Sequence, residues 1–123
     1  MPASLLDDLL ASGRLEAGRA AFNRGDYFHA HELWETLWLQ LDGAERTGVQ
    51  GLIQLAAGLH HLRHRRARPA IGLLEKGLAK LEGLAKLGPV AAHSPTSALA
   101  RAITRLLDDL KSPTLPAPPP LIL

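Results

Sequence analysis

Residues 44–66 read AERTGVQGLIQLAAGLHHLRHRR, and their apolar pattern indicates how the whole chain is arranged. Its apolar residues surround most of the circumference of a helix, whereas a surface helix carries a single apolar stripe. We therefore expect a central helix that other helices cover on several sides. Gly51 and Gly58 lie seven residues apart on it, where their missing side chains would let a neighbouring helix approach closely.

The apolar residues of the whole chain are those that favour helices. Leucine occurs 26 times and alanine 19 times, against six valines and isoleucines together. Because leucine and alanine lose little entropy in a helix, strands are not expected. A chain of 123 residues, 46% of them hydrophobic, can bury one core without a metal or a disulfide. The absence of cysteine excludes thiolate catalysis and cysteine-ligated zinc.

Caps and helix breakers divide the rest of the chain. They predict further helices at 4–12, up to Arg24, from Asp26, from Pro69 to Gly88, and after Ser94. The expected N-caps are Ser4, Asp26 and Ser94, and Asp42 with Glu45 forms a capping-box pattern before the central helix. The prediction is all-α: a single compact domain over residues 1–111, built as a bundle of five or six antiparallel helices.

The C-terminal segment, residues 112–123, has a different composition. Five of its twelve residues are proline, which precludes a helix and favours an extended tail. Its last residues, Leu121 to Leu123, would lie either on the body of the protein or on a partner.

A few polar side chains fall on helix faces that should be buried. On the helix that follows Asp26, His31 and Glu35 share one face beside Trp38, at the margin of the apolar arc. The one polar stripe of the central helix is made of Gln50, Gln54 and His61. Two antiparallel helices joined by a short loop are neighbours, so we expect both sets to converge in the bundle interior.

Two interpretations of this cluster stay open. In the first, it is a small-ligand or hydrolase-like site with His31 and Glu35 as the catalytic residues. The residues that would bind the ligand are Tyr27, Trp38, Gln50, Gln54 and His61. In the second, the cluster is an internal hydrogen-bond network of a structural or interaction protein, whose tail or basic end engages a partner. The number of polar atoms on a core helix favours the first, and the residues leave open whether the protein is an enzyme.

A metal is one version of the first interpretation. His31 and Glu35, four residues apart on a helix, can share one ion, and His61 could complete a three-ligand set with open positions. A divalent metal is not favoured, because glutamine amides are poor ligands and no His-Glu-x-x-His pattern occurs. The chain also lacks a Gly-x-Ser-x-Gly turn and a glycine-rich phosphate loop, so its cofactors stay unknown.

Basic residues cluster at the end of the central helix. They are His60, His61, Arg63, His64, Arg65, Arg66 and Arg68. Cations there complement the helix dipole, and no aromatic residues interleave with them, so nucleic acid is not an expected partner. No stretch reaches the roughly 18 apolar residues of a membrane span, and we expect a cytoplasmic protein. The apolar central helix makes a homodimer a further expectation.

Two motifs resemble a small uncharacterised prokaryotic family catalogued as a domain of unknown function, number three hundred and nine. The first consists of Phe22, Asn23, Gly25, Tyr27, Phe28, His31, Glu32, Glu35 and Trp38. The second consists of Gln50, Gly51, Leu52, Ile53 and Gln54, with Ala56 and His61. The resemblance covers roughly residues 20–85. It implies a compact all-helical fold and a shared inward-facing site, and it implies no activity, cofactor or partner.

Overall fold

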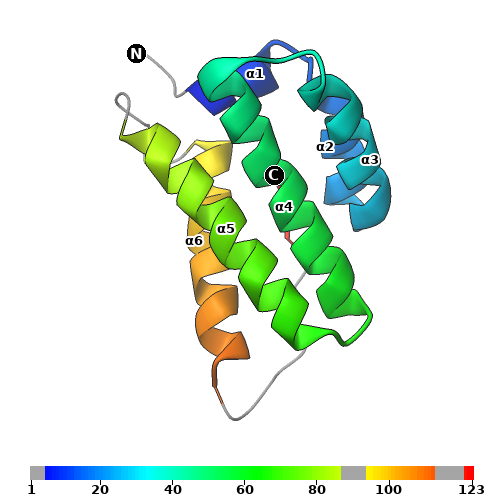
Figure 1. The fold of residues 1–123 in the computed structure, drawn as a ribbon, viewed down its shortest axis with the longest axis vertical. Helices are drawn as coiled ribbons and strands as arrows, with labels where there is room; N and C mark the ends of the chain where they lie inside the picture. Colours follow the sequence, from blue (N-terminus) through cyan, green and yellow to red (C-terminus); the bar gives the residue numbers. More distant parts are fainter. Residues whose placement is uncertain (1–4, 87–93, 113–120) are drawn as a thin grey trace.

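The computed structural model describes residues 5–86, 94–112 and 121–123, and these residues form six helices and no strand. The helices are α1 (Leu5–Ala11), α2 (Glu16–Asn23), α3 (Tyr27–Trp38), α4 (Gly43–Arg63), α5 (Ala67–Ala85) and α6 (Pro95–Leu110), as Figure 1 shows. The all-α class is confirmed. The division at residue 112 stays a prediction. In the part of the chain that the structure describes, no helix is long and apolar enough to cross a membrane.

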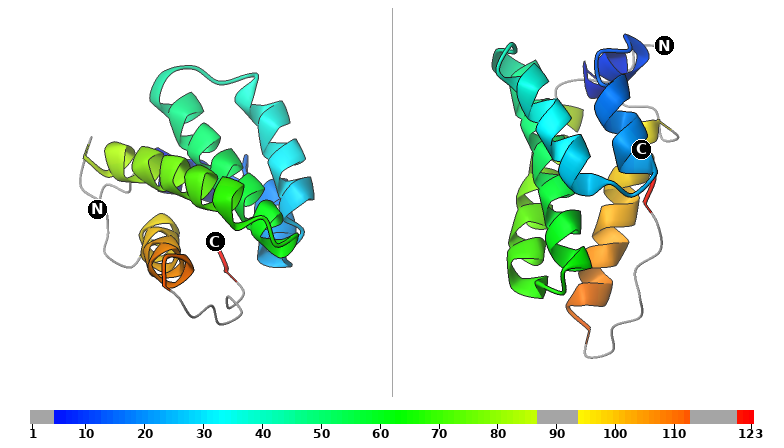
Figure 2. Two further views of the ribbon diagram at one scale, coloured as in Figure 1. Left: turned by 60° about the horizontal axis from the view of Figure 1, so that its bottom comes forward. Right: turned by 90° about the vertical axis from the view of Figure 1, so that its right-hand side faces the viewer.

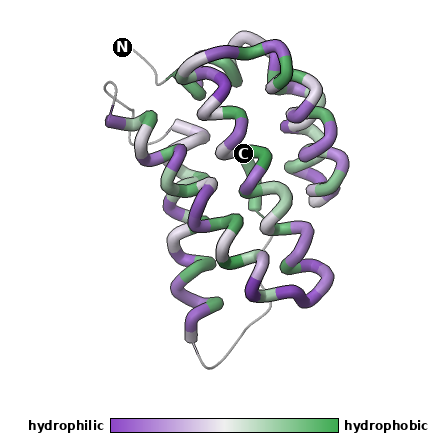
Figure 3. The backbone as a smooth tube through the Cα atoms, viewed as in Figure 1, coloured by the Kyte–Doolittle hydropathy of each residue, from purple (hydrophilic) through white to green (hydrophobic). Residues whose placement is uncertain are grey.

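The α4 helix is the central one, as its apolar sequence predicts. Helices α1, α3 and α5 pack against it directly, α2 packs on α3, and α6 packs on α5 (Figure 1). Hydrophobic and hydrophilic residues alternate along α5 and α6 at helical spacing, so each of these helices turns one apolar face to the bundle (Figure 3). The largest fully buried side chains include Trp34, Phe22, Leu52, Leu55, Leu74, Leu99 and Ile103.

The glycines of α4 lie against α5. A Cβ at Gly51 would lie 3.3 Å from the carbonyl oxygen of Gly77, and a Cβ at Gly58 would lie 3.2 Å from that of Ala70. Gly77 matches them on α5, because a Cβ there would lie only 2.8 Å from the carbonyl oxygen of Gly51. The predicted packing role of the α4 glycines is confirmed, and the helix that approaches them is α5.

Two of the three predicted N-caps are confirmed. The Asp26 side chain accepts a hydrogen bond from the backbone N–H of His29 at 3.4 Å. The Ser94 hydroxyl accepts one from the backbone N–H of Ser97 at 3.1 Å. The third expected cap, Ser4, lies outside the described residues.

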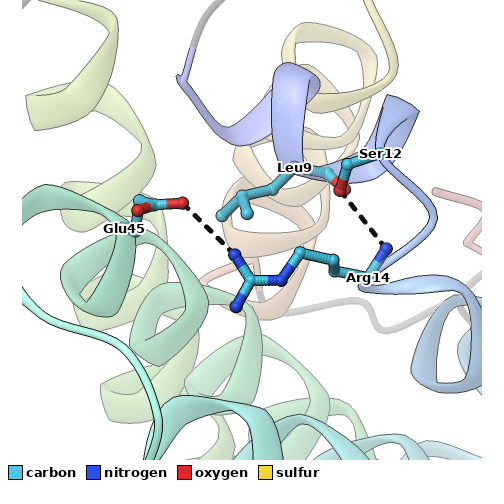
Figure 4. A network of polar contacts seen from close by, with 4 residues as sticks. All are labelled: Leu9, Ser12, Arg14 and Glu45. Atoms are coloured by element: carbon cyan, nitrogen blue, oxygen red, sulfur yellow. Dashed lines mark hydrogen bonds and ion pairs between the residues drawn. The ribbon is translucent and has the colours of Figure 1, made fainter.

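The capping box predicted at the start of α4 is not formed. Asp42 occupies the N-cap position without a capping hydrogen bond from its side chain, and the carboxylate of Glu45 lies 3.9 Å from the guanidinium of Arg14 instead (Figure 4). The Ser12 hydroxyl accepts from the Arg14 backbone N–H and donates to the Leu9 carbonyl, which fixes the turn after α1. Glu45 is therefore used for an ion pair with a segment distant in sequence.

The boundary between α4 and α5 comes earlier than predicted. Arg65 has a φ of +59°, in the left-handed region, and so α4 ends at Arg63 rather than at residue 66. The α5 helix begins at Ala67, which places Pro69 in its first turn, where the missing N–H leaves no helical bond unmade. A basic run without glycine gave no signal for this turn, and the predicted boundary was wrong.

The last residues of the chain lie on the body of the protein. Leu121 and Leu123 are 6% and 4% exposed, whereas Ile122 between them is 67% exposed. In Figure 2 this segment runs beside α2, and hydrogen bonds from Arg19 and Asn23 to Leu123 hold it there. Of the two placements that the sequence left open, residues 121–123 take the first.

Candidate functional site on the α3–α4 face

His31 and Glu35 face each other one turn apart on α3. The distance between His31 Nε2 and Glu35 Oε1 is 3.6 Å. The side chains are 26% and 53% exposed, so the pair lies at the edge of the bundle rather than in its interior. With its Nε2 turned to the carboxylate, His31 has its other ring nitrogen, Nδ1, left for a second partner.

Three members of the predicted site have a buried nitrogen without a partner. Among the described residues, His31 Nδ1, Trp38 Nε1 and His61 Nδ1 are buried and make no hydrogen bond. Leaving such a group unpaired costs about 1 to 3 kcal/mol. A polar cluster that served only to hold helices together would be expected to satisfy these atoms.

The aromatic contacts of His31 lead to the end of α4. The Phe28 ring stacks on the His31 ring, with centroids 6.1 Å apart and planes 18° apart. Phe28 also contacts His60 of α4 at 5.2 Å, and the His60 ring lies 4.5 Å from that of His64. Phe28 is nevertheless 51% exposed. We call this surface the imidazole face and define it as Phe28, His31, Glu35, His60 and His64.

Gln54 serves the other side of α4. Its Oε1 accepts a hydrogen bond from Lys80 Nζ of α5 at 2.8 Å. The contacts of α4 with α3 run instead through His60 and through Arg46, whose guanidinium lies 3.9 Å from the centroid of the Trp38 ring. At 100° per residue, Gln54 lies about 80° from Arg46 and about 120° from His60 around the helix. The contacts therefore turn the Gln54 amide to α5, away from the imidazole of His31.

The remaining predicted ligand-binding residues divide between two places. Gln50 and His61 are half-buried. Around the helix Gln50 lies about 40° from both Gln54 and Arg46, between the α5 and α3 sides of α4, and His61 lies about 20° from Gln54. Tyr27 is buried against Phe22, with ring centroids 5.2 Å apart and an edge-to-face angle of 69°. Arg63 lies over the Tyr27 ring, 5.4 Å from its centroid. Tyr27 thus packs in the core beside the imidazole face.

The predicted three-ligand metal set is not assembled. Within residues 5–86, 94–112 and 121–123, no group of three or more His, Cys, Asp or Glu side chains could hold a metal ion. The physical reason is the rotation of α4. His61, seven residues after Gln54, lies within about 20° of it around the helix and about 100° from His60, whose ring is the one that contacts Phe28 beside His31.

Phe28, His60 and His64 were not among the residues predicted for the site. His60 and His64 were interpreted only as cations that complement the dipole of α4. Their i, i+4 spacing, and the i, i+3 spacing of Phe28 and His31, place each pair on one helix face. These spacings could have indicated the imidazole face in the sequence. The basic residues around His60 and His64 favoured the interpretation as dipole-complementing cations instead.

Four hollows lined by described residues lie away from the imidazole face. One lies between α4 and α5 and includes Thr47, Lys76 and Lys80. The others involve α1, the start of α4, α5 and α6. None of these four is lined by His31, Glu35 or His61.

Burial lowers the pKa of His60 below its ordinary value of 6.5, and the nearby charges of His64, His61, Arg66 and His31 lower it further. The folded protein then binds fewer protons at His60 than the unfolded chain does. The stability contributed by the neutral ring is complete above pH 6.5 and is lost as the pH falls from there through the folded pKa.

We therefore expect an NMR titration to give His60 a lower midpoint in the folded protein than in the urea-unfolded chain. The loss of stability between pH 7 and pH 5 should also be smaller in His60→Gln, because that side chain does not titrate. A folded midpoint at or above the unfolded one would contradict the effect of burial.

A family comparison places both motifs in one domain. Residues 15–73 match the model of a family described as Domain of unknown function (DUF309). Just under half of the chain is thus similar to a DUF309 domain. Its match begins just before α2 and ends in α5, so it includes all of α3 and α4. The resemblance found in the sequence is confirmed, over a range that starts earlier and ends earlier than 20–85. No curated protein and no solved structure matches the chain.

Proposed function

We propose that this protein binds a small polar ligand at the imidazole face, with His31 as the contacting group and Glu35 as the carboxylate that orients it. One observation carries the proposal. His31 Nε2 lies 3.6 Å from Glu35, whereas His31 Nδ1 is buried and unpaired among the described residues. A ligand that hydrogen-bonds to Nδ1 would recover the cost of about 1 to 3 kcal/mol that the free protein bears.

Phe28 is the aromatic neighbour of the His31 imidazole on the same helix. Its ring lies nearly parallel to that of His31 and is itself half exposed to solvent. Exposed aromatic rings often mark binding surfaces, because covering them removes apolar area from water. Rotation of the Phe28 side chain in the first turn of α3 would open the imidazole without a change in the helix. A planar ligand suits this arrangement, because it could stack on the displaced ring.

The proposal is one of binding. An imidazole oriented by a carboxylate can accept or donate a proton at its second nitrogen. A hydrolase-like reaction would use this proton transfer in addition to binding. The alternative function, a structural module with an internal hydrogen-bond network, is disfavoured by the three unpaired nitrogens. A homodimer and a cytoplasmic location remain predictions from the sequence.

His31→Leu tests the proposal without knowledge of the ligand. The substitution removes an unpaired buried nitrogen and replaces the imidazole with an apolar side chain of similar length. We therefore expect the free energy of unfolding to rise by about 1 kcal/mol. His29→Leu, on the same helix but exposed, is the control, with an expected change within about 0.5 kcal/mol. Urea unfolding followed by circular dichroism measures both. A loss of stability in His31→Leu would mean that His31 is internal scaffolding.

A second test measures binding directly. Nicotinamide, benzoate and adenosine are planar probes that carry hydrogen-bonding groups. Ligand-observed NMR should detect saturation transfer to at least one of them with the unaltered protein and none with His31→Leu. Binding that persists in His31→Leu would place the ligand elsewhere on the molecule.

A further inference from the structure

The α2 helix binds the backbone of Leu123 through both its N–H and its oxygen. Asn23 Oδ1 accepts a hydrogen bond from the Leu123 N–H at 2.7 Å, and Asn23 Nδ2 donates one to the Leu123 oxygen at 3.0 Å. A neighbouring strand in a sheet makes this same reciprocal pair with its backbone. Arg19, one turn earlier on α2, donates from Nε to the same oxygen at 2.9 Å. The two side chains thus present a complete set of partners for one extended residue.

The side chains of the bound segment alternate. Leu121 and Leu123 are buried and belong to the hydrophobic core cluster, and Ile122 between them points to solvent. This period of two is that of an extended chain. The protein therefore contacts two aliphatic side chains of the segment, and the side chain between them lies in solvent. Figure 2 shows the segment beside α2, away from the α3–α4 face. The surface that holds residues 121–123 is therefore separate from the imidazole face.

We propose that this surface of α2 binds an extended peptide of another protein, with two leucine-like side chains separated by one residue, in the place that residues 121–123 occupy in the free chain. Backbone hydrogen bonds supply affinity and the two apolar positions supply specificity, as in other sites that bind extended peptides. Within residues 121–123, the hydrogen bonds described above use the backbone of Leu123, and the buried side chains are those of Leu121 and Leu123. A segment of another protein with the same pattern can make the same contacts.

The test uses the full chain with its resident segment weakened. The receptor is the double variant Leu121→Ser, Leu123→Ser, and the probe is a fluorescein-labelled peptide with the sequence PPPLIL of residues 118–123. Fluorescence anisotropy should show saturable binding to the double variant. Binding to the unaltered chain should be at least tenfold weaker, because its own segment competes at high effective concentration. The same peptide with both leucines replaced by serine should bind at least tenfold more weakly.

Asn23→Ala, added to the double variant, should weaken peptide binding at least tenfold. Arg24→Ala is the matched control, since this neighbouring residue is exposed and its ion pair is with Asp26 instead. Equal binding to the unaltered chain and the double variant, or no effect of Asn23→Ala, would overturn the proposal. So would an absence of binding to a folded double variant. Dimerisation of the double variant that excludes the peptide would also overturn it, with a second copy as the occupant.

A measurement on the unaltered chain covers the case in which the double variant fails to fold. Saturating unlabelled PPPLIL should displace residues 121–123 and accelerate hydrogen exchange at the Leu123 amide. Among the described residues, this amide donates its hydrogen bond to Asn23 Oδ1, and displacement breaks that bond. Unchanged exchange at saturation would overturn the proposal.

Discussion

Gly77→Ala is expected to lower the free energy of unfolding by about 3 kcal/mol, the upper end of the usual cost of overpacking. A Cβ at this position would lie 2.8 Å from the Gly51 carbonyl oxygen and 2.8 Å from the Leu55 side chain. Leu55 is fully buried, and Gly51 belongs to the backbone of the central helix, so neither can move aside cheaply. The two helices would have to separate along the seam on which the bundle is built. Urea unfolding followed by circular dichroism measures the loss.

Gly72→Ala and Gly83→Ala are matched controls on the same helix. A Cβ at either position meets no atom within 4 Å. Alanine is the better helix former, so each control should raise the free energy of unfolding by about 0.5 to 1 kcal/mol. The same glycine-to-alanine substitution thus changes the free energy of unfolding in opposite directions at different positions of α5. If Gly77→Ala behaved as the controls do, close packing of α4 on α5 would not hold the bundle together.

The same glycines explain which part of the site the sequence could predict. The spacing of His31 and Glu35 is a local property of one helix, and the structure has it as expected. Which face of α4 meets α3 depends instead on the rotation of α4, and Gly51 and Gly58 set this rotation by admitting α5. Gln54 lies within about 60° of both glycines around the helix, so α5 receives its amide.

Helix boundaries show the same division between local and distant causes. Asp26 and Ser94 accept hydrogen bonds from backbone N–H groups three residues later, so their caps could be predicted from the local sequence. Glu45 fits a capping box equally well by pattern, and Arg14 competes for it across the fold. The contact between Asn23 and Leu123 joins opposite ends of the chain and has no counterpart in any local pattern.

Asp7→Ala is the second substitution with a large expected effect. Asp7 is 8% exposed, and its Oδ1 accepts hydrogen bonds from the Thr96 backbone N–H at 3.2 Å and from Thr96 Oγ1 at 2.8 Å. Thr96 is the second residue of α6, where backbone N–H groups lack helical partners and the helix dipole favours a negative charge. Asp7 therefore caps α6 from α1, at the opposite end of the sequence.

Removal of this carboxylate leaves the buried Thr96 N–H without its acceptor and reduces the partners of Thr96 Oγ1 to the Ser94 hydroxyl at 3.4 Å among the described residues. Hydrogen bonds to a charged group contribute about 1.5 to 3 kcal/mol each, and we expect Asp7→Ala to cost about 3 kcal/mol in urea unfolding. Asp7→Asn should cost less, because its amide oxygen still accepts while the charge at the helix terminus is lost. Asp8→Ala, the exposed neighbour, should change stability by no more than about 0.5 kcal/mol. Equal effects of Asp7→Ala and Asp8→Ala would show that the acidic residues serve only the first turn of α1, and that α6 is held by its apolar face alone.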